Sequence, residues 1–361
     1  MGDAARVAVA MSGGVDSSVA AALLLERGYS VLGLTMRLWQ EHPTSCGDFD
    51  GVSAARLVCR CLGVPHRVVD LRREFLQKVV GYFVAEYARG RTPNPCLRCN
   101  RAIKFGLLRD HARQLECGFL ATGHYARIER TGGDYRLLCG VDIRKDQSYF
   151  LYTLQQEHLR SLLMPLGTCT KAQVRTLAEA KGLPVVDRPE SQDICFLGDG
   201  DYRRFIRSRR PEAVRPGPIY NVQGQLLGEH KGLPFYTIGQ REGLGISAPR
   251  PLYVVRLDVA RNALIVGYAE ALSRNALFAK EMFYVSGHSP STASPVEAKI
   301  RYRAKRASAH IWPLPGRRAR IAFEKPLGDM TPGQRVVLYS GEQVLGGGII
   351  SAIDTADAPP A

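Results

Sequence analysis

The sequence predicts a doubly wound α/β domain, followed by a small central β-rich domain and a C-terminal β-barrel. In the first part of the chain, short apolar stretches alternate with helical patterns, which is typical of a parallel sheet covered by helices. Gly, Pro and short strand-like pieces then dominate, and the final part alternates apolar and polar residues as small barrels do. A chain of 361 residues is also too long for one typical core. We therefore expect domains at residues 1–200, 201–271 and 272–361.

The first expected strand, helix and loop form a phosphate-binding pattern. Arg6–Ala10 is short and apolar, as in a buried parallel strand, and Val15–Arg27 has apolar residues at helical spacing before Gly28 ends the helix. Between them lies the polar turn Ser12–Gly14. A glycine-rich loop at a helix N-terminus presents free N–H groups to an anion. The alternative is a tight turn with no ligand.

The remaining elements of the first domain follow the same alternation. Further strands are expected at Ser30–Met36, His66–Asp70 and Phe119–Thr122, and further helices at Val52–Leu62, Phe75–Ala88, Asn100–Gln114, Lys145–Leu151 and Lys171–Lys181. Ligands of such sheets gather at the carboxyl ends of the strands. Met36 is therefore either a wall for a nucleotide base or a core residue. Gly123 suits close approach of the backbone to a nucleotide, and His124 is either a proton carrier or a structural histidine.

A second conspicuous loop carries two cysteines. Pro93 and Pro95 argue against a helix before Cys96, so we expect the helix to begin near Asn100. Cys99 then lies close to a helix N-terminus, which favours the thiolate form. Three cations nearby in the sequence act in the same direction: Arg98, Arg101 and Lys104.

The chain carries an excess of positive charge, with 49 Lys and Arg against 34 Asp and Glu and a net charge of +15. This excess favours a nucleic-acid or polyphosphate partner, the alternative being a basic surface without a partner. Many of these residues crowd into the last domain: Lys299, Arg301, Arg303, Lys305, Arg306, Arg317, Arg318 and Arg320.

The compartment is indicated by what the sequence lacks. No apolar stretch approaches the length of a membrane span, and Met1–Ala5 lacks the features of a signal peptide. We therefore expect a cytoplasmic protein without a membrane partner. Nine cysteines in a reducing compartment are not expected to form a disulfide framework, so clustered cysteines would serve chemistry.

The phosphate loop resembles a known signature. It lacks the Gly-Lys-Ser/Thr ending of a Walker loop and is similar to the Ser-Gly-Gly-Xaa-Asp-Ser signature of PP-loop ATP pyrophosphatases, which cleave ATP to AMP and pyrophosphate. Together with the cysteines, the chain resembles the tRNA-specific 2-thiouridylase family, which thiolates position 2 of the wobble uridine. The resemblance covers Met11–Ser18, Thr92–Phe105, Ala121–Arg127, Lys145–Phe150, Ser191–Phe196, Thr237–Gly245, Arg301–Tyr302 and Gly346–Ile350.

The resemblance implies a role for each matching position. ATP would contact Ala10, Met11, Ser12, Gly13, Gly14, Val15, Asp16, Ser17, Met36 and Gly123, with Asp16 helping to place Mg²⁺. The target base would face Asn94, Pro95 and Cys96, and tRNA would contact His124, Lys145, Asp146, Gln147, Arg301, Tyr302 and Gln334. Cys99 matches the family nucleophile, and Cys195 matches the residue that receives sulfur as a persulfide.

The implied reaction begins with adenylation of the uridine O2 and continues with attack by persulfide sulfur and release of AMP. Cys99 would free the sulfur from Cys195 by closing a disulfide. The partners implied are tRNA carrying a wobble uridine and a sulfur-donor protein, such as a cysteine desulfurase or a sulfur carrier.

One departure from the family pattern opens a second mechanism. Many members carry Asp where this chain has Cys96. Cys96, Cys99 and Cys195 are therefore also candidate ligands of an iron–sulfur cluster, the alternative being that Cys96 only lines the base pocket. Two other classes also remain open at this point, a PP-loop ligase acting on a small acid and a non-catalytic nucleic-acid-binding protein with an inactive loop.

Overall fold

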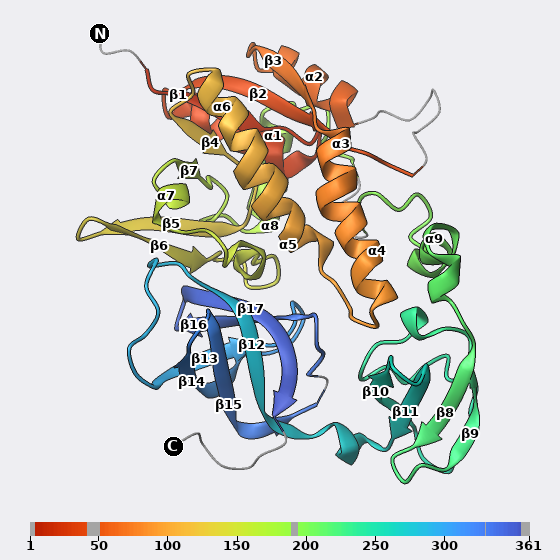
Figure 1. The fold of residues 1–361 in the computed structure, drawn as a ribbon. Helices are drawn as coiled ribbons and strands as arrows, with labels where there is room; N and C mark the ends of the chain where they lie inside the picture. Colours follow the sequence, from red (N-terminus) through yellow and green to blue (C-terminus); the bar gives the residue numbers. More distant parts are fainter. Residues whose placement is uncertain (1–3, 42–50, 189–193, 329, 355–361) are drawn as a thin grey trace.

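The first domain is built on a five-stranded parallel sheet (Figure 1). The computed structural model describes residues 4–41, 51–188, 194–328 and 330–354. The strand order is β3-β2-β1-β4-β7. The strands are β1 (Arg6–Ala10), β2 (Ser30–Arg37), β3 (His66–Asp70), β4 (Phe119–Ala121) and β7 (Leu162–Leu163). Because the order reverses between β1 and β4, the loops after these two strands meet at the position where open α/β sheets bind ligands.

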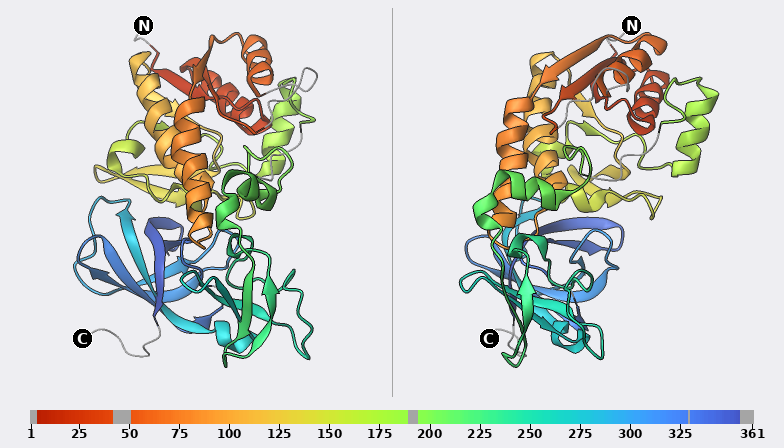
Figure 2. Two further views of the ribbon diagram at one scale, coloured as in Figure 1. Left: turned by 45° about the vertical axis from the view of Figure 1, so that its right-hand side comes forward. Right: turned by 90° about the vertical axis from the view of Figure 1, so that its right-hand side faces the viewer.

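Helices cover both faces of this sheet (Figures 1 and 2). One layer contains α1 (Val15–Glu26), α2 (Gly51–Cys61) and α8 (Lys171–Ala180). The other contains α3 (Arg72–Phe75), α4 (Gly81–Ala88), α5 (Pro95–Cys99) and α6 (Arg109–Gln114), joined by the π-helical turns η1 (Leu76–Val80) and η2 (Asn100–Leu108). Val7 and Val9 of β1 face the first layer and Ala8 faces the second, as the period of a strand requires. The predicted doubly wound fold is confirmed.

Two helix predictions differ from the structure. The helix expected from Asn100 begins at Pro95, because proline at the first helical position loses no hydrogen bond and Asn94 caps the helix. The segment expected to be helical from Lys145 forms only the short 3₁₀ helix η3 (Ser148–Leu151), which precedes α7 (Gln156–Leu159).

A hairpin that was not predicted joins the first domain to the barrel. It consists of β5 (Ala126–Thr131) and β6 (Asp134–Cys139), and β6 pairs with the barrel strand β17 (Gln343–Asp354). Its turn is Gly132-Gly133, with both glycines at positive φ. Alternating residues around a Gly-Gly pair are a sequence signal for a hairpin.

The central module contains one helix and a four-stranded sheet. The helix α9 (Tyr202–Arg209) lies where only strands and loops were expected, because the Asp201 side chain caps it by accepting from two backbone N–H groups. The sheet has the order β10-β11-β8-β9. Its strands are β8 (Gly217–Asn221), β9 (Leu226–His230), β10 (Tyr253–Asp258) and β11 (Ala263–Gly267), with the 3₁₀ turns η4 (Pro211–Ala213), η5 (Leu233–Phe235) and η6 (Ala269–Leu272) nearby.

The predicted C-terminal β-barrel is confirmed, and the structure shows that it is closed, antiparallel and built from six of the described strands. They are β12 (Arg274–Tyr284), β13 (Ser294–Lys299), β14 (Ala307–Leu314), β15 (Arg318–Leu327), β16 (Arg335–Ser340) and β17. Pairing of β12 with β17 closes the barrel around a core that includes Leu277, Ile311 and Ile321. Within the described ranges, no helix is long and apolar enough to span a bilayer.

The close approach of β4 to α1 gives a testable prediction about the first domain. A Cβ atom at Gly123 would lie 2.8 Å from the backbone carbon of Asp16 and 2.9 Å from the Ser17 nitrogen. Gly123→Ala should therefore force the two elements apart and lower the free energy of unfolding by about 1–3 kcal/mol. Urea denaturation measures the change. The matched control is Gly118→Ala, where the nearest atom is 3.9 Å away and little change is expected; equal stability of the two variants would contradict the prediction.

Candidate nucleotide and thiol site

The loop between β1 and α1 is held ready to receive an anion. Gly14 is the N-cap residue of α1, and Ser17 and Ser18 both donate from their hydroxyls to its carbonyl, at 3.0 and 2.9 Å. The backbone N–H of Ser12 donates to Ser17 Oγ at 3.2 Å. These bonds fix the loop beside the N-terminus of a helix of twelve residues. The arrangement suits the phosphates of a nucleotide.

Gly13 occupies a position that admits no side chain. Its φ of +76° lies in the left-handed region, and a Cβ atom there would be 2.6 Å from the Gly51 carbonyl oxygen and 2.8 Å from Ala54 Cβ. Arg188 Nη1 donates to the Gly13 carbonyl at 3.0 Å. Arg188 thus brings a positive charge to the loop, and the sequence analysis missed it because it lies 175 residues further along the chain.

Asp16 is held by two residues that the sequence analysis did not select. Its Oδ1 atom accepts from Tyr125 Oη at 2.8 Å and from Lys171 Nζ at 2.7 Å. Both contacts use Oδ1, and the other carboxylate oxygen, Oδ2, is the atom that could bind a cation. Magnesium in phosphate sites is commonly bound by one or two carboxylates together with phosphate oxygens, so this donor set fits Mg²⁺ in the presence of a nucleotide. Lys171 begins α8, and only the tertiary fold brings it to the loop.

Met36 and Gly123 lie at the ends of the strands that flank β1. Met36 is partly buried and packs against two core clusters, which supports its alternative role as a core residue. Gly123 contacts the first turn of α1 closely. Both residues therefore lie beside the loop that was predicted to bind ATP.

The cysteine helix α5 presents Cys96 and Cys99 one turn apart. Asn94 Oδ1 accepts from the Leu97 N–H at 3.2 Å and caps the helix. Residues three apart lie on the same face of a helix, so the two thiols point in a similar direction. Pro95 and Leu97 are buried and anchor this short helix.

Burial rather than charge decides the ionisation of the thiols. Desolvation raises the pKa of Cys99 to about 11, with a further increase from Cys96 and an opposing effect of Lys104. Part of the Cys195 side chain reaches solvent, yet enough protein surrounds its sulfur that desolvation, with help from Cys99 and Cys96, raises its pKa to about 12. The prediction that the helix N-terminus and nearby cations favour the thiolate is wrong for this arrangement, because desolvation outweighs them.

The three thiols lie close enough to influence one another's ionisation. The charge on Cys96 and Cys99 acts on Cys195, and Lys104 acts on all three. In the described part of the chain, however, no three Cys, His, Asp or Glu side chains form a group that could hold a metal ion. As placed here, the thiols do not fit an iron–sulfur cluster. Residues 191–193 of the Ser191–Phe196 motif lie outside the described residues.

Lys104 connects the thiols to the nucleotide loop. Its Nζ lies 3.5 Å from His124 Nε2, and His124 Nδ1 is 2.8 Å from Thr122 Oγ1. His124 is buried, and desolvation together with the Lys104 charge lowers its pKa, so the imidazole is neutral at physiological pH. Since Gly123 follows Thr122 and lies against the first turn of α1, a chain of neighbouring residues runs from the thiols through Lys104 and His124 to the phosphate loop.

The predicted tRNA-contacting residues fall into two groups. Lys145 and Tyr302 influence each other electrostatically, and the Tyr302 ring lies 4.5 Å from that of Phe150. Other predicted residues make internal hydrogen bonds. Asp146 accepts from Gly140 and Ser148, Gln147 accepts from the Tyr125 N–H, and Gln334 donates to the Thr92 carbonyl. Arg301 lies one residue before Tyr302.

The basic residues of the barrel do not form one free face. Arg320 is buried, pairs with Asp354 and stacks on Trp312, and Arg317 donates to the Met282 carbonyl. Arg306 stacks on Tyr339. The sequence clustering therefore overstates the charge available to a partner.

Comparisons with known proteins decide the family. Three family models match the chain in succession. The model described as the tRNA methyl transferase HUP domain matches residues 5–199, and the model described as the tRNA methyl transferase PRC-barrel domain matches residues 203–268. The model described as the Aminomethyltransferase beta-barrel domain matches residues 274–350. The tRNA-specific 2-thiouridylase MnmA of Moorella thermoacetica is 50% identical and covers 96% of this chain and 99% of its own. The same enzyme of Chloroflexus aurantiacus is 47% identical and covers 98% and 100%.

The chain belongs to the tRNA-specific 2-thiouridylase family. The resemblance inferred from sequence motifs is confirmed, and the protein is an enzyme of the transferase class. Among solved structures, the U34-tRNA thiolase NcsA from Methanococcus maripaludis with its 4Fe-4S cluster is 21% identical. That match covers 58% of this chain and 65% of the other with a TM-score of 0.35, a likeness that carries no argument about the site.

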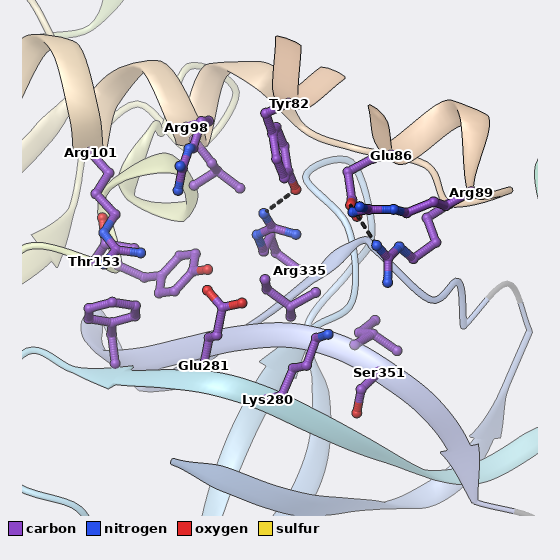
Figure 3. Close-up of a pocket in the computed structure, with 16 residues that line it drawn as sticks. Tyr82, Glu86, Arg89, Arg98, Arg101, Thr153, Lys280, Glu281, Arg335 and Ser351 are labelled. Carbon is purple, nitrogen blue, oxygen red and sulfur yellow. Dashed lines mark hydrogen bonds and ion pairs between the residues drawn. The ribbon is translucent and has the colours of Figure 1, made fainter. Parts of the chain in front are cut away.

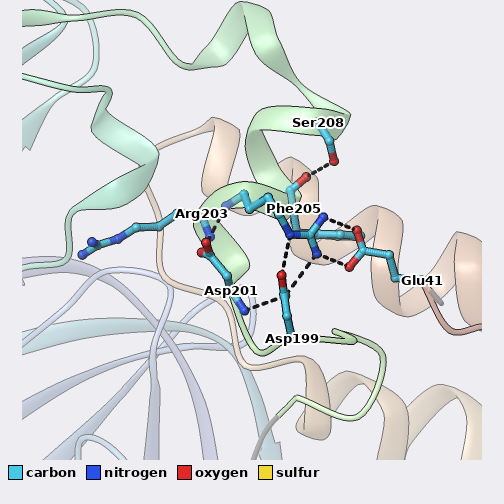
Figure 4. Close-up of polar contacts among 7 residues, drawn as sticks. Glu41, Asp199, Asp201, Arg203, Phe205 and Ser208 are labelled. Carbon is cyan, nitrogen blue, oxygen red and sulfur yellow. Dashed lines mark hydrogen bonds and ion pairs between the residues drawn. The ribbon is translucent and has the colours of Figure 1, made fainter. Parts of the chain in front are cut away.

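In this thiouridylase an ion-pair network anchors the segment that follows Cys195, and Figure 4 shows Glu41 and Asp199, the two carboxylates of the network. Arg204 binds Glu41 with two hydrogen bonds of 2.7 and 2.6 Å and reaches Asp199 at 2.6 Å. Its guanidinium lowers the pKa of Asp199 to about 2. The Glu41 N–H also donates to the Phe196 carbonyl at 3.2 Å, and Phe196 is buried against Phe83 and two other aromatic rings. Phe196, which follows Cys195, is thus held through its backbone by Glu41 and through its ring by aromatic packing.

This network predicts a positioning role for Arg204. Arg204→Lys keeps the charge but loses the two-pronged contact with Glu41. We expect the rate at which a mild oxidant links Cys99 to Cys195 to fall about tenfold, which corresponds to about 1.4 kcal/mol of lost positioning. Mass spectrometry of peptide pairs measures this rate. The control is Arg210→Lys, whose pair with Glu212 is exposed and lies away from the Cys195 segment; an Arg204→Lys protein that links at the control rate would rule out the role.

Proposed function

We propose that the protein uses ATP to replace O2 of the wobble uridine in tRNA with sulfur. The observation that carries the proposal is the chain of contacts that links the three thiols to the phosphate loop through Lys104, His124 and Gly123. The family supports tRNA as the substrate, since the curated relatives are named tRNA-specific 2-thiouridylases. The proposed domains are residues 1–200, 201–271 and 272–361.

Activation of the base is assigned to the phosphate loop. The backbone N–H groups at the start of α1, with Arg188 and Lys171 close by, would hold the phosphates while uridine O2 attacks the α-phosphorus and pyrophosphate leaves. Asp16 Oδ2 would bind Mg²⁺, which neutralises phosphate charge when it is bound. A base stacked in the anticodon loop cannot reach this site, so the uridine must be turned out of the stack.

Sulfur delivery is assigned to Cys195 and Cys99. The outer sulfur of a Cys195 persulfide would attack C2 of the activated uridine, and AMP would leave with the former O2. The Cys99 thiolate would then attack Cys195 Sγ, which forms the Cys99–Cys195 disulfide and leaves the sulfur on C2. A thiol reductant restores both cysteines, and a cysteine desulfurase or sulfur carrier would supply the next persulfide. Both thiols have raised pKa values, so loss of their protons is a step that the site must assist.

The role of Asp16 gives the first test. Asp16→Asn keeps the size of the side chain but removes the charge that would bind Mg²⁺ and that now binds Lys171. We expect tRNA-dependent AMP formation to fall at least about a hundredfold, while tRNA binding stays within about twofold because the carboxylate would only repel RNA. Thin-layer separation of labelled AMP measures the first and filter binding the second. Asp110→Asn on the exposed side of α6 is the control; near-normal AMP formation by the Asp16 variant would overturn the loop assignment.

The three cysteines separate the persulfide relay from the iron–sulfur alternative. Under the proposed relay, Cys99→Ala and Cys195→Ala lose thiolation, whereas Cys96→Ala keeps it within about tenfold because that thiol takes no part in the relay. Under the cluster mechanism all three substitutions abolish activity, since each removes an iron ligand. Thiolated tRNA is detected by its retardation in a mercury-containing gel, with protein purified anaerobically. An inactive Cys96→Ala protein that has also lost bound iron would replace the relay with the cluster.

A further inference from the structure

A cavity that neither the three thiols nor the phosphate loop lines lies between the cysteine helix and the barrel (Figure 3). Its volume is about 370 Å³, and its walls come from α4, α5, β12 and β17. Figure 3 shows Arg98 and Arg101 reaching into it from the helices, and Lys280 and Glu281 from the barrel. The cations that line it are Arg89, Arg91, Arg98, Arg101, Lys280 and Arg335.

Positive charge in this cavity exceeds the charge that the protein itself can neutralise. Two carboxylates face six cations. Glu86 already pairs with Arg89 and Arg91, at 3.3 and 2.6 Å. Glu281 acts electrostatically on Arg101 without a hydrogen bond. Among the described residues, neither Arg101 nor Lys280 has a hydrogen-bond acceptor for its charged N–H groups.

The charged form of the Arg101 guanidinium is disfavoured by its surroundings. It lies 4.3 Å from the centre of the Phe283 ring, and burial, Arg98 and Arg317 lower its pKa. Arg98 stacks over Tyr82 at 5.4 Å. Cations that are desolvated and close to other cations are stabilised when an anion binds between them. Arg98 Nε donates to the Lys78 carbonyl at 3.2 Å, and stacking on an aromatic ring leaves the terminal N–H groups of both guanidinium groups available.

The barrel strand is distorted where it meets the cavity. Neighbouring residues of a regular strand point to opposite faces, yet Lys280 and Glu281 both line this cavity. The pairing of β12 with β17 shifts register between Lys280 and Phe283, and Glu281 has a φ of +50°. A left-handed residue other than glycine costs of order 1–3 kcal/mol, and bulges of this kind re-aim side chains near functional sites. The bulge explains how the neighbouring residues Lys280 and Glu281 both face the cavity that Arg98 of α5 and Arg101 of η2 also line.

We propose that this cavity binds a backbone phosphate of the RNA substrate. The inference rests on the proposed function for its substrate class. Arginine guanidinium groups and a lysine ammonium in a partly enclosed space are suited to bind a phosphate. Leu97, Arg98 and Arg101 place the cavity beside the helix that carries Cys96 and Cys99. A phosphate held there would fix the RNA strand against that helix. Inorganic phosphate or pyrophosphate has the same chemistry and is the other source to be distinguished.

The test measures the salt dependence of tRNA binding by Lys280→Gln and Arg101→Gln. Each lost phosphate contact should reduce the slope of log K against log salt by about 0.7, which at 0.1 M salt corresponds to about fivefold weaker binding. Arg60→Gln, on the exposed end of α2, is the control and should keep the wild-type slope. Circular dichroism and ATP binding check that each variant is folded. Slopes reduced in both cavity variants and not in the control support the proposal.

Two other outcomes would overturn it. Unchanged slopes, with inorganic phosphate or pyrophosphate bound by the wild-type protein and bound less tightly by the variants, would assign the cavity to a free anion. Unchanged slopes without such binding would remove the phosphate site altogether. Failure of the proposed function is distinguishable from failure of this proposal. If the proposed function is wrong, the wild-type protein does not thiolate tRNA. If only this proposal is wrong, the wild-type protein thiolates tRNA and the variants keep its salt slope.

Discussion

The position of the cysteine helix depends on hydrogen bonds from one loop and strand of the barrel. Gln334 donates to the Thr92 carbonyl at 3.2 Å, just before α5. The Arg335 guanidinium reaches Tyr82 Oη on α4 at 2.9 Å, and Tyr149 Oη donates to the Arg335 carbonyl at 3.0 Å. Buried hydrogen bonds of this kind each contribute about 0.5–1.5 kcal/mol, and an unmade partner costs more. The barrel therefore helps to hold the helix that carries Cys96 and Cys99.

Desolvation governs the chemistry of the site. Although Cys96 and Cys195 are partly exposed, the surrounding protein desolvates the thiols enough to raise their pKa values despite the nearby Lys104. The same burial keeps His124 neutral. A raised pKa lowers the fraction of thiolate, the form that reacts with oxidants and binds metals, and so slows both reactions. Reaction then requires an arrangement in which the thiolate charge is better compensated, and Lys104, which already acts to lower the pKa of all three thiols, is the cation placed to do so.

The positive charge of the chain is used in three different ways. Some arginines serve the fold, as Arg320 does by pairing with Asp354 inside the barrel wall. Arg204 fixes the segment that carries Cys195. Others, including Arg101 and Lys280, face open space between the domains. Net charge therefore indicated the class of partner correctly, but it could not indicate where the partner binds, because location depends on which charges are already neutralised.

The sequence by itself determined the elements whose signals are local. The strand Arg6–Ala10, the glycine-rich loop and the helix after it followed from periodicity and turn chemistry, and the family followed from dense motifs. The start of α5 was missed because a helix can begin at a proline when the preceding residue caps it. Whether Asn94 caps the helix depends on the orientation of its side chain, which the sequence does not give. Contacts between distant segments, such as Lys171 and Tyr125 with Asp16, were decided only by the tertiary structure. Packing also set the thiol pKa values, because desolvation depends on which atoms surround a group and no local pattern of residues records them.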